Sequence, residues 1–301
     1  MKNAMRTDVA GELLENLPLP DGVEKHTDRW AGVEVTTVHI DRAAEKTVGK
    51  PEGTYITVED RTGTAENESI VRVLVKELKG LLLGLEGPVL VAGLGNRLVT
   101  PDSLGPRTCE KVFVTRHIGS HAPELAPDNL RQVAVMAPGV LGTTGMETLE
   151  VLTGVVDAIR PCAVLCIDAL ASLQMERIAS VVQLNDSGIL PGAGVGNRRL
   201  RLDRASLGVP VIAIGVPTVV HAGVIAGESA RLLQEKTGMA DAGDALAAMT
   251  AELMEERYPN FVMTLKDVDK LIEDASRRLS QSINRALHGE NYEELKALTE
   301  A

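Results

Sequence analysis

The sequence predicts an α/β domain built on a mostly parallel sheet with helices on both faces and an N-terminal β extension. The first observation is a set of short apolar runs without polar alternation, separated by segments long enough for a helix, which is typical of parallel strands buried on both faces. The second is size, because 301 residues with 44% hydrophobic side chains bury a core without disulfides or a structural metal. The four runs span residues 88–96, 131–140, 162–168 and 209–217.

The remaining elements follow in chain order. Residues 33–60 alternate around the turn GKPEG, which predicts a hairpin that extends the sheet. A helical pattern starts at about Asn67 and ends near residues 84–87. The last helix covers about residues 268–287, with a capping box expected from Thr264 and Asp267.

Residues 208–227 form the longest apolar run. Its length suffices for a bilayer, but Pro210, Pro217 and His221 interrupt it, so we expect a buried strand followed by a loop. No composition break divides residues 33–290, which favours a single domain. Residues 1 to about 30 contain Pro18, Pro20 and Gly22 and are expected to form a detachable N-terminal arm.

Composition excludes several classes of function. The net charge of −11 repels a phosphate backbone and 2% aromatic residues leave few stacking platforms, so nucleic acid is not an expected partner. Cys109, Cys162 and Cys166 cannot all pair, which favours reduced core cysteines in a cytosol-like compartment. The N-terminus has no apolar signal core, so we expect no export. No metal, cofactor or membrane span is expected.

Two aspartates follow the apolar strands, where open parallel sheets bind their ligands. Asp168 ends the run CAVLCID, and Asp102 lies in the loop VTPDSLG after the run of residues 88–96. An aspartate between a strand and a helix is also a common N-cap, and that interpretation stays open for each one. If the two carboxyl groups lie close together at one edge of the sheet, they cannot both ionise easily, and one keeps a proton. The pair then supplies an acid and a base.

The glycine-rich loops do not fit a nucleotide site. In the stretch 93–98, leucine stands where the dinucleotide fingerprint needs its third glycine, and no phosphate-loop lysine follows any glycine cluster. Glycine loops can instead let the backbone approach an extended substrate closely, with amide groups that face a developing oxyanion. The other interpretation, tight turns that bind no ligand, stays open. The candidate substrate or oxyanion residues are Gly139, Gly142, Gly145, Gly194 and Gly196.

Taken together, these motifs resemble the germination proteases of endospore-forming bacteria. The blocks keep that family's order and cover almost the whole chain. They are RTDVA at 6–10, GLGN…VTPDSLGP at 93–106, VTRH at 114–117, APGVLGTTGMET at 137–148, IDALA at 167–171, DSGILPGAGVGNRR at 186–199 and LGVPVIAIGVPTVV at 207–220.

The resemblance implies an endopeptidase that degrades small, acid-soluble spore proteins in the spore core during germination. It also implies a zymogen, a homotetramer, the fold of hydrogenase-maturation endopeptidases and an atypical aspartic mechanism whose residues here are Asp102 and Asp168. His221 and Leu173 depart from the family pattern, where aspartate and arginine are expected. The alternatives are a metal-linked maturation peptidase that uses His221, and a non-catalytic nucleotide-binding regulatory module.

The arm itself resembles a substrate of this family. Residues 7–12, TDVAGE, show the order acidic, apolar, alanine, any residue, glutamate that the family's substrates have around the bond that is cut. We therefore expect self-cleavage between Asp8 and Val9, promoted by acid because one carboxyl group must hold a proton. This cleavage would separate a propeptide, residues 1–8, from a single α/β peptidase domain, residues 9–301. The alternative is a frayed terminus that any protease trims.

Overall fold

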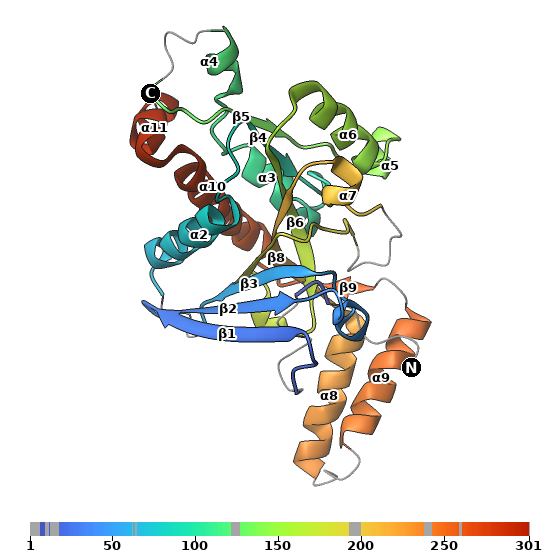
Figure 1. Ribbon diagram of the computed structural model, residues 1–301. Coiled ribbons are helices and arrows are strands. Elements are labelled where there is room, and N and C mark those ends of the chain that lie inside the picture. The colour runs from blue at the N-terminus through green and yellow to red at the C-terminus, as the bar shows by residue number, and fades with distance from the viewer. Residues whose placement is uncertain are drawn as a thin grey trace.

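The computed structural model describes residues 7–9, 12, 18–61, 63, 65–121, 127–192, 200–237, 243–258 and 261–300. Figure 1 shows one twisted sheet with helices packed on it and a helical hairpin that projects from one end. The sheet has nine strands in the order β1-β2-β3-β7-β8-β6-β4-β5, with β9 paired to β8. The predicted α/β class is confirmed.

The four apolar runs form the parallel part of the sheet, as predicted. They are β4 (Val89–Gly93), β5 (Val133–Met136), β6 (Ala163–Ser172) and β8 (Val211–His221). Their parallel pairings are β5 with β4, β4 with β6 and β6 with β8. These strands read as continuous apolar stretches because both of their faces are covered.

The N-terminal β extension is confirmed and is larger than the sequence indicates. β1 (Val23–Trp30), β2 (Val33–Ile40) and β3 (Gly53–Glu59) pair antiparallel, and β3 joins the parallel part through β7 (Val181–Asn185). The sheet is therefore mixed. The strand β7 was not predicted, because its five residues, VVQLN, are too few for a clear alternating pattern and contain two polar residues that interrupt an apolar run.

Helices cover both faces of the sheet, as expected. Side chains alternate along the strands, so Val89 and Val91 of β4 lie in one core cluster while Leu90 and Ala92 lie in the other. The first cluster is closed by α2 (Asn67–Leu81), α3 (Leu104–Cys109) and α10 (Val268–His288), and the second by α6 (Thr148–Ile159) and α7 (Arg204–Leu207). The remaining described elements are α1 (Glu45–Val48), η2 (Thr100–Asp102), α4 (Arg116–His121), α5 (Leu141–Thr144), η4 (Met175–Arg177), α8 (Ala222–Thr237), α9 (Gly243–Arg257), β9 (Val262–Met263), η7 (Gly289–Asn291) and α11 (Tyr292–Glu300).

Two local predictions are wrong. The loop expected after the run 208–227 is instead helix α8, which forms a hairpin with α9 (Figure 1). The small residues permit it, because a Cβ on Gly223 would lie 2.9 Å from the Ala251 carbonyl oxygen. The capping box of α10 also fails, since the Thr264 hydroxyl donates to the Thr218 carbonyl oxygen at 2.7 Å, and Asp267 caps without a side-chain hydrogen bond.

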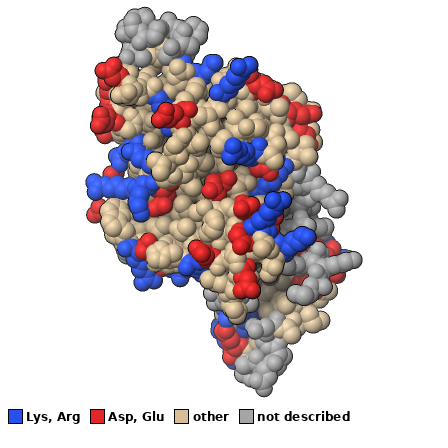
Figure 2. Space-filling model, viewed as in Figure 1, with Lys and Arg blue, Asp and Glu red and all other residues tan. Residues whose placement is uncertain are grey.

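Surface and core agree with a globular domain. On the face that Figure 2 shows, acidic and basic side chains of the described residues are interspersed. Cys109 and Cys166 are buried, Cys162 is half-buried, and all three are free. Among the helices of the described ranges, none has the length and apolar character needed to cross a bilayer.

Candidate active site

Asp102 ends the short helix η2, between strand β4 and helix α3. The chain leaves β4 through Gly95, whose φ of +103° favours glycine, and a Cβ there would lie 2.1 Å from the Asp102 carbonyl oxygen. The Asn96 amide donates to Asp102 Oδ2 at 2.7 Å. Ser103, and not Asp102, is the N-cap of α3, so the capping interpretation of Asp102 is wrong.

Asp168 lies inside β6, directly after the point where its neighbour β4 ends. Gly93, the last residue of β4, pairs with Ile167. The Asp168 side chain is buried, and its Oδ1 accepts a hydrogen bond from the Ala169 amide at 2.9 Å. Because β6 continues to Ser172, no helix follows Asp168, and the N-cap interpretation is wrong here as well.

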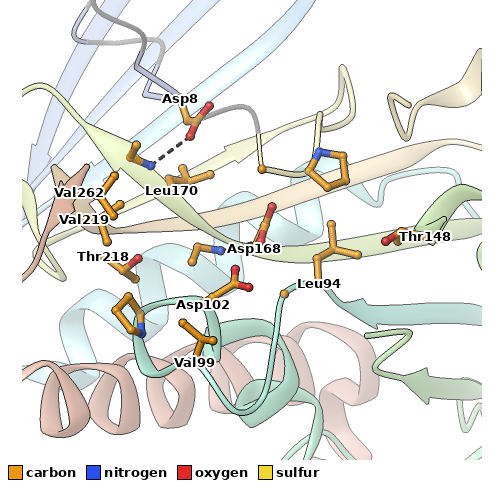
Figure 3. Close-up of a pocket in the computed structure, with 16 residues that line it drawn as sticks. Asp8, Leu94, Val99, Asp102, Thr148, Asp168, Leu170, Thr218, Val219 and Val262 are labelled. Atoms are coloured by element: carbon orange, nitrogen blue, oxygen red, sulfur yellow. Dashed lines mark hydrogen bonds between the residues drawn. The ribbon is translucent and has the colours of Figure 1, made fainter. Parts of the chain in front are cut away.

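One cavity of about 260 Å³ contains both carboxyl groups. Figure 3 shows them projecting into the same space, Asp168 from β6 and Asp102 from the turn before α3. The wall of the cavity is largely apolar, and it includes Asp8 of the N-terminal arm. The lining residues are Asp8, Leu94, Gly95, Val99, Pro101, Asp102, Thr148, Asp168, Ala169, Leu170, Ala171, Pro191, Gly192, Thr218, Val219 and Val262.

The arm contacts the end of β6 through one backbone hydrogen bond and one bond to a carboxylate. The Asp8 amide donates to the Ala171 carbonyl oxygen at 3.2 Å, and the Ala171 amide donates to Asp8 Oδ2 at 3.0 Å, the contact dashed in Figure 3. The Asp8 carbonyl oxygen accepts from Lys50 Nζ at 3.2 Å and from Gln183 Nε2 at 2.9 Å. The carbonyl group of the Asp8–Val9 bond therefore faces two side-chain donors.

Burial sets the electrostatics of this contact. It raises the pKa of the Asp8 carboxyl above its ordinary value, against the opposing effect of the Lys50 ammonium. Burial likewise lowers the pKa of Lys50, against the effect of Asp8. Both groups are thus held in surroundings that disfavour charge, and each is the other's main counterion.

No sequence pattern indicates that Lys50 or Gln183 lies at this site. Gln183 pairs in register with Gly215 of β8, which in turn pairs with Asp168, so Gln183 and Asp168 lie in one row across the sheet. Because β7 was not predicted, this row could not be anticipated. A lysine before a turn and a glutamine in a strand match no catalytic motif.

The other sequence candidates lie elsewhere. Gly139 and Gly145 adopt positive φ on either side of α5, which contains Gly142, and none of the three lines the cavity. Gly194 and Gly196 lie outside the described residues. His221 is buried, with Nδ1 3.5 Å from Glu255 Oε1, and it does not line the cavity either. Within the described ranges, no group of three or more His, Cys, Asp or Glu side chains is placed to hold a metal ion.

Gly95→Ala tests how the turn positions Asp102. Positive φ and the 2.1 Å approach predict a loss of about 2 kcal/mol or more in the free energy of unfolding. Urea denaturation measures this loss. Gly142→Ala is the control, because a Cβ at Gly142 meets nothing within 4 Å, and its stability should stay near wild type. A Gly95→Ala chain as stable as wild type would refute the strained turn.

Comparison with known proteins shows the family of this chain. The family model described as germination protease matches residues 14–251. A germination protease of Caldanaerobacter subterraneus subsp. tengcongensis is 42% identical over 306 residues, covering 94% of each chain. Those of Clostridium tetani and Priestia megaterium are 39% and 33% identical, covering 94% and 95% of this chain and 95% and 94% of theirs.

Among solved structures, a nickel–iron hydrogenase maturation protease from Thermococcus kodakarensis matches with a TM-score of 0.33 and 18% identity, covering 60% of this chain and 99% of that one. The relatives at 33–42% identity extend over nearly the whole chain, and the family model covers more than half of it. This chain therefore belongs to the germination protease family.

Proposed function

We propose that this peptidase is an aspartic-type endopeptidase that uses Asp102 and Asp168 to start the degradation of small, acid-soluble spore proteins in the germinating spore core. The observation that carries the proposal is the shared cavity, which receives both carboxyl groups and also a residue of the chain's own arm, Asp8. The family match supports the peptidase class and the link to germination.

The proposed chemistry needs one carboxylate and one carboxylic acid. The ionised member takes a proton from water, whose oxygen attacks the peptide carbonyl carbon, while the protonated member donates to the carbonyl oxygen or to the leaving nitrogen. Apolar neighbours such as Leu94, Val99 and Val219 surround the pair, and in such surroundings two close carboxyl groups resist double ionisation. The proposed mechanism requires this pair to hold one proton.

The arm supports a self-processing zymogen. Its Asp8 amide donates to the Ala171 carbonyl oxygen at the end of β6, and its Asp8 carbonyl oxygen accepts from Lys50 and Gln183. Donors at this position would also stabilise the oxyanion that forms on attack. While the arm occupies the cavity, a protein substrate is excluded from it. We also propose a homotetramer, which the exposed side chains of Leu233, Met249 and Leu253 on the α8–α9 hairpin support.

The test is incubation of the purified chain, after acid treatment, with a small, acid-soluble spore protein, followed by mass spectrometry of the fragments. We expect cleavage at a few bonds, each followed by an apolar residue and alanine. Thermal stabilisation by a nucleotide without cleavage would instead favour a regulatory module. Cleavage that requires added nickel or zinc would favour a metal-linked maturation peptidase.

A further inference from the structure

Two side chains from different parts of the sheet converge on the carbonyl oxygen of Asp8. Lys50 Nζ lies 3.2 Å from this oxygen, and Gln183 Nε2 lies 2.9 Å from it. Lys50 lies between α1 and β3, and Gln183 lies in β7, the strand that pairs with β3. A carbonyl oxygen has two lone pairs, so these two donors occupy both of them.

Gln183 and Asp168 project from the same face of the sheet. Both residues pair in register with Gly215 of β8, which lies between them. The residues that adjoin these three along the chain pack into the core cluster on the opposite face, and they are Leu184, Ile214 and Ile167. Because side chains alternate along a strand, Gln183 and Asp168 point to the other face, where Gln183 reaches the arm.

Little water reaches the two contacts with the Asp8 carbonyl oxygen. Gln183 is 4% exposed, and burial lowers the pKa of Lys50 below its ordinary value. In such surroundings a hydrogen-bond donor stabilises a negative charge more strongly than it does in water. If the carbonyl oxygen becomes an oxyanion, its bonds to Lys50 and Gln183 therefore strengthen, and an interaction that strengthens in the transition state accelerates a reaction.

We propose that Lys50 and Gln183 are catalytic residues that bind the oxyanion, and that the protonated member of the pair Asp102 and Asp168 donates to the leaving nitrogen alone. We call Lys50 and Gln183 the oxyanion site. The inference rests on the proposed function, which allows that proton to go to the oxygen or to the nitrogen, and it selects the nitrogen. The reason is that an oxygen with both lone pairs occupied has no place for a third donor.

The proposed reaction has two steps. In the first, the water oxygen bonds to the carbonyl carbon of Asp8, the ionised aspartate takes the proton that water loses, and the π electron pair moves to the carbonyl oxygen, which the oxyanion site holds. In the second, that electron pair re-forms the carbonyl group, the bond to the Val9 nitrogen breaks, and a protonated aspartate gives its proton to this nitrogen. The pair of aspartates ends with one proton, as it began.

The test follows self-cleavage of the full chain in acid by mass spectrometry and measures its first-order rate constant. Lys50→Met and Gln183→Met keep most of the side-chain volume and remove one donor each, so each should slow self-cleavage about a hundredfold or more. Lys50→Arg keeps a charged donor and should recover most of the rate. Lys46→Met is the matched control, because Lys46 is exposed on α1, and it should cleave at the wild-type rate.

Hydrogen exchange separates catalysis from anchoring of the arm. The Ala171 amide donates to the Asp8 carboxylate, so it is protected while the arm is docked. Exchange is measured at the same pH with Asp168→Asn added to each variant, so that the arm stays uncut. We expect the Ala171 amide to stay protected in Gln183→Met, which decides the test if Lys50→Met fails to fold or releases the arm. Loss of protection in both variants would make Lys50 and Gln183 anchors of the arm and would overturn the oxyanion site.

The proposed function and the oxyanion site fail in different ways. Wild-type rates in Lys50→Met and Gln183→Met would overturn the oxyanion site and leave the proposed function intact. A wild-type chain that cleaves neither its own arm nor a spore protein would overturn both. If wild type cleaves a spore protein but not its arm, kcat for the spore protein replaces the self-cleavage rate in the same comparison of variants.

Discussion

Asp102→Asn and Asp168→Asn are each expected to lower kcat for peptide cleavage by about a hundredfold or more, while the fold is retained. Asparagine has nearly the same shape as aspartate and can still accept from the Asn96 or Ala169 amide, so the substitution removes the ionisable group without leaving a cavity. Rates of spore-protein cleavage, together with the circular dichroism of each variant, measure the two effects.

Asp157→Asn is the control for this pair, because Asp157 is exposed on α6 and does not line the cavity. It should retain the wild-type rate. Near-wild-type turnover by a folded Asp102→Asn or Asp168→Asn chain would show that the carboxyl groups have another role, and the aspartic mechanism would have to be abandoned.

Acid incubation of the full chain is expected to release residues 1–8, with Val9 as the new first residue. Burial raises the folded-state pKa of Asp8 above its unfolded value, so Asp8 contributes most to arm docking below the unfolded pKa and loses that contribution as the pH rises through the raised pKa. The other charges that act on Asp8 are Lys50 and His221, which oppose the rise, and Glu12, which adds to it. Acid therefore supplies the proton for catalysis and also favours the protonated Asp8 of the docked arm.

N-terminal sequencing at a series of pH values measures this processing. Asp168→Asn is the control, and its chain should remain intact from Met1. The zymogen interpretation is wrong if that variant is trimmed at the same bond and rate, or if the wild type acquires a different first residue. Either result would instead favour a frayed terminus open to any protease.

The sequence predicts the central strands and the two aspartates for the same physical reason. A strand buried on both faces must be apolar throughout, so β4 and β6 are visible as runs, and a polar residue at the end of such a run is conspicuous. The residues that contact the arm could not be predicted in this way. Lys50 and Gln183 donate to the Asp8 carbonyl oxygen, and Arg177 Nη1 lies 3.4 Å from Glu12 Oε1. They come from a turn, a short unpredicted strand and a 3-10 helix, and only tertiary packing brings them to the arm.

Small residues explain the other differences between the predicted and the observed structure. Alanine and glycine after His221 have no apolar periodicity that would indicate a helix, yet they allow α8 and α9 to approach closely. The glycines at 139–145 form turns and a short helix that do not line the cavity, because a positive φ serves a turn whether or not a ligand is near. Backbone contacts of this kind have no signature in a single sequence.

The position of Glu12 after the predicted cut has a kinetic consequence. Cleavage at Asp8–Val9 would leave Glu12 covalently attached to the enzyme, so its contacts with Ser172, Leu173 and Arg177 would hold the new terminus near the cavity at the high effective concentration that a short tether imposes. What cleavage would remove is Asp8, with its hydrogen bonds to Ala171, Lys50 and Gln183. The remaining tethered segment must then be weak enough for a protein in solution to displace. The turnover of the processed enzyme would thus be set by a competition between its own new terminus and its substrate.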